Sequence, residues 1–214
     1  MDTDARIDSI FDLLDRWRNL PAYQLERRAD IFFALYIPKI IRKRFGMEVS
    51  CLIPEFPVRV GHVYPESRLT HPNRSFKIDY VAVAEASGTV FLIELKTDSL
   101  SHRESQKKYL ERAKKINVPG LVEGVLEICR ATASKKKYAN LVALLAPAGW
   151  VDAGTCTNIA PPYKVEVVYI QPDGAGDGNI IPFRAIAEYL KDETDAVTRR
   201  FVESLKTWET NPNG

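Results

Sequence analysis

The sequence has little cysteine and no long apolar run, and these two shortages exclude several classes of protein. Its three cysteines, Cys51, Cys129 and Cys156, lie far apart among 214 residues and form no C-x-x-C pair, so we expect reduced thiols. No stretch of about 18 apolar residues occurs, and a transmembrane helix is therefore not expected. The amino terminus is acidic and amphipathic, unlike the basic and then apolar pattern of a signal peptide. Together these features predict a cytoplasmic protein that does not act at a membrane.

Several catalytic patterns are also missing. The three histidines, His62, His71 and His102, show neither the H-x-H nor the H-E-x-x-H spacing, so we do not expect a zinc site. The sequence contains no G-x-S-x-G motif, no P-loop and no dinucleotide-binding glycine pattern. Chemistry based on an activated serine, ATP or NAD therefore has no support in the sequence.

What the chain does contain is a globular composition with an uneven distribution of charge. Hydrophobic residues make up 45% and charged residues 27% of a length that suits one domain, which we predict to span residues 1–214. The net charge is only +2, but residues 101–140 carry ten Lys and Arg against four Glu. The region after residue 172 carries five basic and eight acidic residues. This asymmetry favours a polyanion as ligand, with a solvated lysine-rich face as the alternative.

Apolar spacing and turn residues predict the order of helices and strands. Two prolines in the first strand predict an edge or bulged strand, and Pro38 is expected to kink the second helix or to start a new one. The continuous apolar run YANLVALLAP predicts a strand buried on both faces. The predicted elements are helices over 4–18 and 23–45, a strand over 47–61, a hairpin over 76–96, helices over 99–116 and 121–133, strands over 138–147 and 163–172, and a helical region over 182–208.

Three charged side chains, Asp79, Glu94 and Lys96, interrupt the otherwise apolar hairpin. Charge is costly to bury, and both faces of this hairpin are apolar enough to be covered. A symmetric four-residue loop at Glu85–Gly88 pairs residues whose numbers sum to 173 and so places Asp79 opposite Glu94. Two facing carboxylates need a shared proton or a cation, and Mg²⁺ or Mn²⁺ suits such a pair.

These residues carry a family resemblance. Asp79, followed on the next strand by Glu94, Leu95 and Lys96, resembles the signature of the PD-(D/E)XK nuclease superfamily, although Ile78 stands where many members have proline. The resemblance implies a restriction-endonuclease-like α/β fold, with an αβββαβ core over about residues 22–147 and a mixed central sheet flanked by helices. It also implies that Asp79 and Glu94 bind Mg²⁺ with the Leu95 carbonyl as a further ligand, and that Lys96 orients or activates the attacking water.

Further residues follow from the same resemblance. The stretch ESQKKYL resembles the Gln/Tyr helix motif of exonuclease-like branches, and it assigns Gln106 to positioning the water or a phosphate, with Tyr109 in support. These two residues are three apart, where the motif usually has four, so packing alone is the other reading of Tyr109. Many members add an acid from the first core helix, for which Glu26 and Asp30 are both candidates. The candidates for phosphate contacts are Lys107, Lys108, Tyr109, Lys114 and Lys115.

The sequence thus predicts a Mg²⁺-dependent nuclease that acts on DNA. One alternative is a catalytically inactive module of the same fold that binds nucleic acid or a protein partner. Another is a protein-interaction domain in which the Asp79, Glu94 and Lys96 cluster is only a structural ion pair. The choice between DNA and RNA, the cutting mode and the oligomeric state, including a homodimer, stay open at this point.

Overall fold

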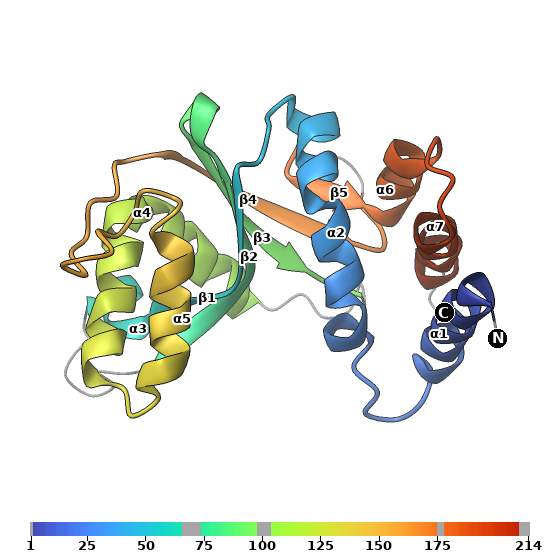
Figure 1. Cartoon of the computed structure of the whole chain (residues 1–214), viewed down its shortest axis with the longest axis horizontal. Coiled ribbons are helices and arrows are strands. Elements are labelled where there is room, and N and C mark those ends of the chain that lie inside the picture. Colours follow the sequence, from blue (N-terminus) through green and yellow to red (C-terminus); the bar gives the residue numbers. More distant parts are fainter. Residues whose placement is uncertain (1, 66–73, 98–103, 175–177, 210–214) are drawn as a thin grey trace. The chain divides into compact units, whose positions relative to one another are not determined.

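A computed structural model describes residues 2–65, 74–97, 104–174 and 178–209 and shows an α/β protein with an open five-stranded mixed sheet (Figure 1). The strand order is β1-β2-β3-β4-β5, and helices flank the sheet. The chain divides into two compact units. The first unit consists of Met1–Gly46, Leu95–His102 and Val168–Gly214, and the second unit consists of Met47–Glu94 and Arg103–Val167.

An antiparallel sheet forms the centre of the second unit. Strand β1 (Cys51–Arg59) pairs with β2 (Ser75–Ala84), which pairs with β3 (Thr89–Leu95). The turn between β2 and β3 is a 3-10 segment over Glu85–Ser87, closed by Gly88 at φ +60°, a conformation that glycine adopts without steric cost. The pairs run from Tyr80 with Ile93 to Ala84 with Thr89, so the predicted register is confirmed.

Strand β1 is the first strand in the sheet order, as its two prolines predict. Pro54 and Phe56 face Tyr80 and Ile78, while Glu55 between them has φ +51° and is exposed. Prolines donate no hydrogen bond, so the outer edge of a sheet is where they fit. Helix α3 (Val60–Val63) follows directly and was not predicted from the sequence.

Two further helices complete the second unit, α4 (Glu104–Ala131) and α5 (Lys135–Leu145), which lie side by side (Figure 1). Asn117 has non-helical angles (φ 64°, ψ 170°) inside α4, which confirms the predicted break before Pro119. Ser101, the predicted cap of this helix, lies outside the described residues.

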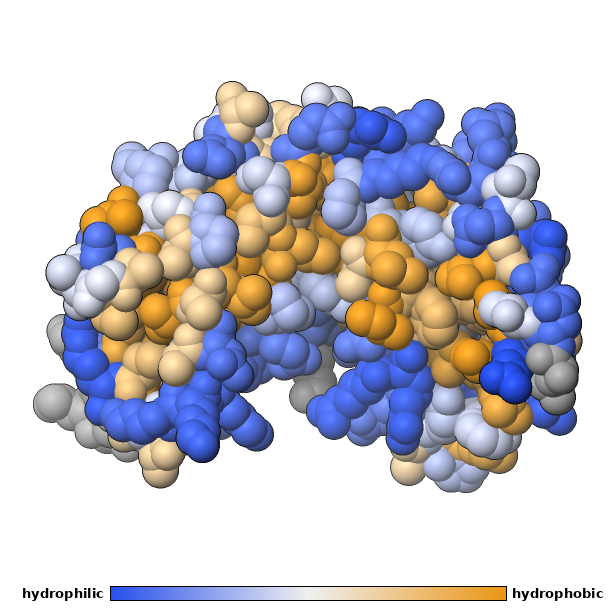
Figure 2. All heavy atoms as spheres, in the orientation of Figure 1, coloured by the Kyte–Doolittle hydropathy of each residue, from blue (hydrophilic) through white to orange (hydrophobic). Residues whose placement is uncertain are grey.

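The predicted strand over 138–147 is wrong, because this segment forms most of α5. The run is rich in alanine and leucine, which favour helices, and holds one β-branched residue, Val142. An apolar run alone does not distinguish a strand from a helix. Leu145 is the one buried side chain of α5, and Leu144 is 45% exposed. Figure 2 shows apolar side chains at the surface over this helix. The next strand of the sheet after α4 is instead β4 (Lys164–Gln171), which confirms the predicted strand over 163–172.

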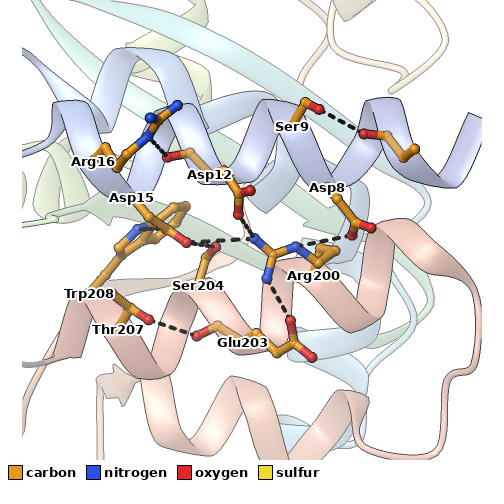
Figure 3. Close-up of polar contacts among 11 residues, drawn as sticks. Asp8, Ser9, Asp12, Asp15, Arg16, Arg200, Glu203, Ser204, Thr207 and Trp208 are labelled. Atoms are coloured by element: carbon orange, nitrogen blue, oxygen red, sulfur yellow. Dashed lines mark hydrogen bonds and ion pairs between the residues drawn. The ribbon is translucent and has the colours of Figure 1, made fainter. Parts of the chain in front are cut away.

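Four helices build the first unit around an aromatic core. They are α1 (Thr3–Trp17), α2 (Leu25–Phe45), α6 (Phe183–Leu190) and α7 (Ala196–Glu209). Phe11, Phe33, Phe201 and Trp208 are almost fully buried, and the rings of Phe33 and Phe201 meet edge to face at 5.0 Å. Helix α1 packs along α7, where polar contacts surround Arg200 (Figure 3).

Helix α2 runs continuously through Pro38 and ends at Gly46, which is left-handed at φ +72°. The predicted end at Gly46 is therefore confirmed. Of the two outcomes predicted at Pro38, a kink or a new helix, the new helix does not occur. The short strand β5 (Ile180–Pro182), which was not predicted, runs parallel to β4 through pairs such as Tyr169 with Ile180. No helix within the described residues has the length and apolarity to cross a bilayer.

Candidate active site

The end of the β2–β3 hairpin away from the turn brings the two predicted acids opposite each other. Tyr80 pairs with Ile93, and continuing this register by one residue places Asp79 on β2 opposite Glu94 on β3. Glu94 is 1% exposed and Asp79 is half-buried. Like charges directly opposite each other on paired strands are destabilising, so this position of the sheet calls for compensation.

Helix α4 holds the Glu94 carboxylate with two donors. The Gln106 amide nitrogen donates to Glu94 Oε1, and the Tyr109 hydroxyl lies 3.4 Å from Glu94 Oε2. The structure therefore places Gln106 on the carboxylate itself, whereas the sequence assigned it to water or phosphate.

Tyr109 is 5% exposed, and its hydroxyl donates to the backbone carbonyl of Lys77 at 2.9 Å. Burial raises the pKa of this phenol far above its ordinary value, and the charges of Glu94 and Asp79 raise it further. The hydrogen bond with Gln106 opposes this shift in the pKa. Tyr109 is thus a protonated donor in the interior, and both carboxylates are close enough to act on it.

Lys96 and one of the two candidate acids of α2 meet in the first unit. The Lys96 ammonium lies 3.8 Å from Glu26 Oε2, and the backbone N–H of Lys96 donates to the Ile170 carbonyl at 2.8 Å. The Lys96 side chain is 8% exposed, compared with 35% for Glu26. Asp30 accepts a hydrogen bond from the backbone N–H of Ile31. Of the two candidate acids, Glu26 is the one for which the structure shows an ion pair with Lys96.

Glu94 ends a segment of the second unit, and Lys96 follows it by two residues in the chain. Two residues of extended chain span at most about 7 Å, so covalent geometry alone keeps the backbone positions of Glu94 and Lys96 close.

The predicted phosphate-binding lysines of α4 fall into two groups. Lys107, Lys108 and Lys115 are exposed. Lys114 forms an ion pair with Glu166 on β4, with 3.0 Å between Nζ and Oε2, and Glu166 also contacts Lys164 at 3.0 Å. The negative charge of Glu166 offsets Lys114, so we expect Lys114 to contribute least to phosphate binding.

The donor set suits a hard divalent cation held by few protein ligands. Among the residues that the structure describes, no three His, Cys, Asp or Glu side chains are grouped as a metal site. Mg²⁺ often takes only one or two carboxylates and keeps several waters, so the Asp79 and Glu94 carboxylates suit its chemistry. Donors to a metal-ligating carboxylate are a common feature of metal sites, and Gln106 and Tyr109 fill that position.

Sequence reasoning missed Phe76, whose ring stacks on Tyr109 with a centroid distance of 4.6 Å and an interplanar angle of 2°. A strand residue and a helix residue 33 positions apart share no sequence signal, so only the fold shows this contact.

A comparison of the chain with models of protein families, with curated proteins and with solved structures finds no match.

Proposed function

We propose that this protein is a nuclease that uses Mg²⁺ or Mn²⁺ to hydrolyse phosphodiester bonds, with DNA as the expected substrate. The observation that carries the proposal is the Glu94 carboxylate, which is 1% exposed, next in register to Asp79, and held by Gln106 and Tyr109. A buried carboxylate beside a second one is costly without a cation or a shared proton. Such a position is a common feature of metal and catalytic sites.

In this proposal Asp79, Glu94 and the Leu95 carbonyl hold the cation. When bound, the cation neutralises charge on the phosphate and lowers the pKa of a water molecule. Lys96 provides an ammonium two residues from Glu94, and an electrostatic donor of this kind stabilises charge that develops on a scissile phosphate. Glu26 orients Lys96 through their ion pair.

The order of elements supports the resemblance to the PD-(D/E)XK superfamily. Within the described residues, helix α2, strands β1 to β3, helix α4 and strand β4 follow one another with the αβββαβ pattern, and short helical segments and α5 lie between them. Because β4 replaces the predicted strand over 138–147, the core in this proposal extends to Gln171.

Incubation with single- and double-stranded DNA and RNA tests the proposal, with Mg²⁺, Mn²⁺ or EDTA in parallel reactions. We expect cleavage of DNA that EDTA abolishes and that Asp79→Ala lacks. Glu85→Gln is the matched control, since Glu85 is an exposed acid at the turn of the same hairpin. Wild-type protein that neither cleaves any of these substrates nor binds Mn²⁺ in calorimetry would rule the proposal out.

The ion pair of Lys96 with Glu26 also suits an inactive module in which the charges are structural. In that case the protein binds nucleic acid or a protein partner without hydrolysis. Mn²⁺ binding together with cleavage favours the nuclease, while DNA binding without metal affinity favours the inactive module.

A further inference from the structure

Phe76 and Lys77 are neighbours on β2, and together they contact Tyr109 at two points. The flat ring of Phe76 covers a face of the Tyr109 ring, with a centroid distance of 4.6 Å and nearly parallel planes. The carbonyl of Lys77 accepts a hydrogen bond from the Tyr109 hydroxyl at 2.9 Å. A tyrosine side chain has two rotatable bonds before the hydroxyl, so a stacked ring and one bonded oxygen fix its orientation.

This orientation determines how the hydroxyl meets Glu94. The Tyr109 oxygen lies 3.4 Å from Glu94 Oε2 and 2.9 Å from the Lys77 carbonyl oxygen, so both oxygens are within acceptor distance of the hydroxyl. A change of the χ1 angle of Tyr109 would carry the whole ring, and with it the hydroxyl, away from both oxygens. The Phe76 ring, which is half-buried, lies flat against the Tyr109 ring and opposes this movement.

We propose that Phe76 is a positioning residue for the Glu94 carboxylate and that it acts through the ring of Tyr109. The inference rests on the proposed function only for its consequence in metal binding. The contact between Tyr109 and Glu94 exists without a metal, and it can be measured in the metal-free protein.

The surroundings of Phe76 provide a matched control. Tyr64 meets Phe76 edge to face at 6.0 Å, and the Arg112 guanidinium lies 4.3 Å from the centre of the Tyr64 ring. Tyr64→Leu therefore removes an aromatic neighbour of Phe76 without touching the stack on Tyr109. If Phe76 only fills space, Tyr64→Leu and Phe76→Leu should act alike.

The first measurement is the carboxyl ¹³C resonance of Glu94 in metal-free protein at one fixed pH, assigned with Glu94→Gln. We expect Phe76→Leu to shift this resonance in the same direction as Tyr109→Phe, and the double variant to shift it no further than Tyr109→Phe does. Phe76→Tyr, which retains the flat ring, should restore the wild-type position, and Tyr64→Leu should keep it. A folded Phe76→Leu protein with the wild-type resonance, or an equal shift in Tyr64→Leu, would overturn the inference. If Phe76→Leu does not fold, Phe76→Met, which is flexible and also lacks a flat ring, takes its place under the same criteria.

The second measurement is Mn²⁺ affinity by calorimetry. Loss of a residue that orients a metal ligand typically weakens binding by about 10- to 100-fold, and we expect Phe76→Leu to fall at the lower end of this range. Tyr64→Leu should change the affinity less than about twofold. Unchanged affinity in Phe76→Leu would overturn the consequence for metal binding. Wild-type protein without Mn²⁺ affinity contradicts the proposed function instead, and the Glu94 resonance then decides the positioning role alone.

Discussion

Arg200 in the first unit and Glu94 in the second unit are both surrounded by polar groups, but the groups differ in kind. Arg200, on α7, contacts four carboxylates from α1 and α7, at distances between 2.6 and 3.8 Å (Figure 3). Three of these four acids, Asp8, Asp12 and Glu203, have side chains that are 49% to 61% exposed. Glu94 is 1% exposed, and the donors from α4 that hold it are a neutral amide and a neutral hydroxyl.

The difference separates two uses of charge. Around Arg200, a guanidinium that is 16% exposed meets opposite charges, three of which are on exposed side chains, so the charges compensate one another within the protein. At the hairpin end, a carboxylate is buried beside another carboxylate, and burial of negative charge next to negative charge is costly. We therefore expect the charges around Arg200 to serve stability and those at the hairpin end to serve the proposed function, and the following experiments test both expectations.

The largest effect is expected from loss of an acid at the hairpin end. Asp79→Asn and Glu94→Gln keep the shape of each side chain and remove its charge, so we expect both variants to fold and to lose Mn²⁺ binding and detectable hydrolysis. Calorimetry with Mn²⁺ and a nuclease assay check this. If Asp79→Asn still hydrolyses DNA, Asp79 is not part of the active site.

The second-largest loss of hydrolysis is expected from Lys96→Ala, which distinguishes a catalytic role of Lys96 from a structural one. If Lys96 is catalytic, the variant should fold and bind Mn²⁺ but hydrolyse DNA about 10² to 10³ times more slowly, as for loss of one electrostatic donor. If Lys96 serves only its ion pair with Glu26, the free energy of unfolding should fall and the rate of hydrolysis should not. Glu26→Gln, measured in the same assays, shows whether Glu26 affects the rate of hydrolysis only through its ion pair with Lys96. Wild-type rates in Lys96→Ala would refute its assigned role.

The lysines of α4 allow a comparison, within one helix, between exposed lysines and a lysine that forms an ion pair. Lys107 and Lys108 are exposed, whereas Lys114 forms an ion pair with Glu166. Each phosphate contact contributes about 0.9 to the slope of log affinity against log salt for duplex DNA. Lys107→Ala with Lys108→Ala should therefore flatten the slope more than Lys114→Ala does, in a titration of DNA binding at several salt concentrations. Equal slopes in all variants would remove this helix from the binding surface.

The sequence predicts the hairpin well because its signals are local. The Glu85–Gly88 turn, the alternation of both strands and the register that aligns Asp79 with Glu94 all lie within 21 residues. The wrong strand over 138–147 has the opposite cause, since burial on two faces is decided by the fold and not by an apolar run. The contacts of Tyr109 with Phe76, Lys77 and Glu94 depend on how α4 crosses the sheet. Spacing along the chain does not encode them.

Arg200→Ala should affect stability and not hydrolysis. Exposed ion pairs contribute about 0.2 to 1 kcal/mol each, so the loss of this cluster should lower the free energy of unfolding by about 1 to 2 kcal/mol. The effect should shrink in high salt, because these charges lie near the surface. Denaturant titrations at two salt concentrations measure it, with Arg199→Ala as the control for an exposed arginine on the same helix. A loss of hydrolysis in folded Arg200→Ala would break the contrast between the two regions.

The smallest effect is expected at the start of α7, where the Asp195 carboxylate accepts hydrogen bonds from the backbone N–H of Thr198 at 3.0 Å and from its hydroxyl at 2.5 Å. These bonds lower the pKa of Asp195 below its ordinary value. The stabilisation is therefore present above the pKa of the unfolded state, about 3.9, and is lost as the pH falls through the lower pKa of the folded state. Asp195→Ala should cost about 1 kcal/mol near pH 7, as for other helix caps, and less at pH 2 to 3. Urea unfolding across this pH range measures the difference from wild type. A difference that stays constant down to pH 2 would show that the charge of Asp195 does not contribute to the cap.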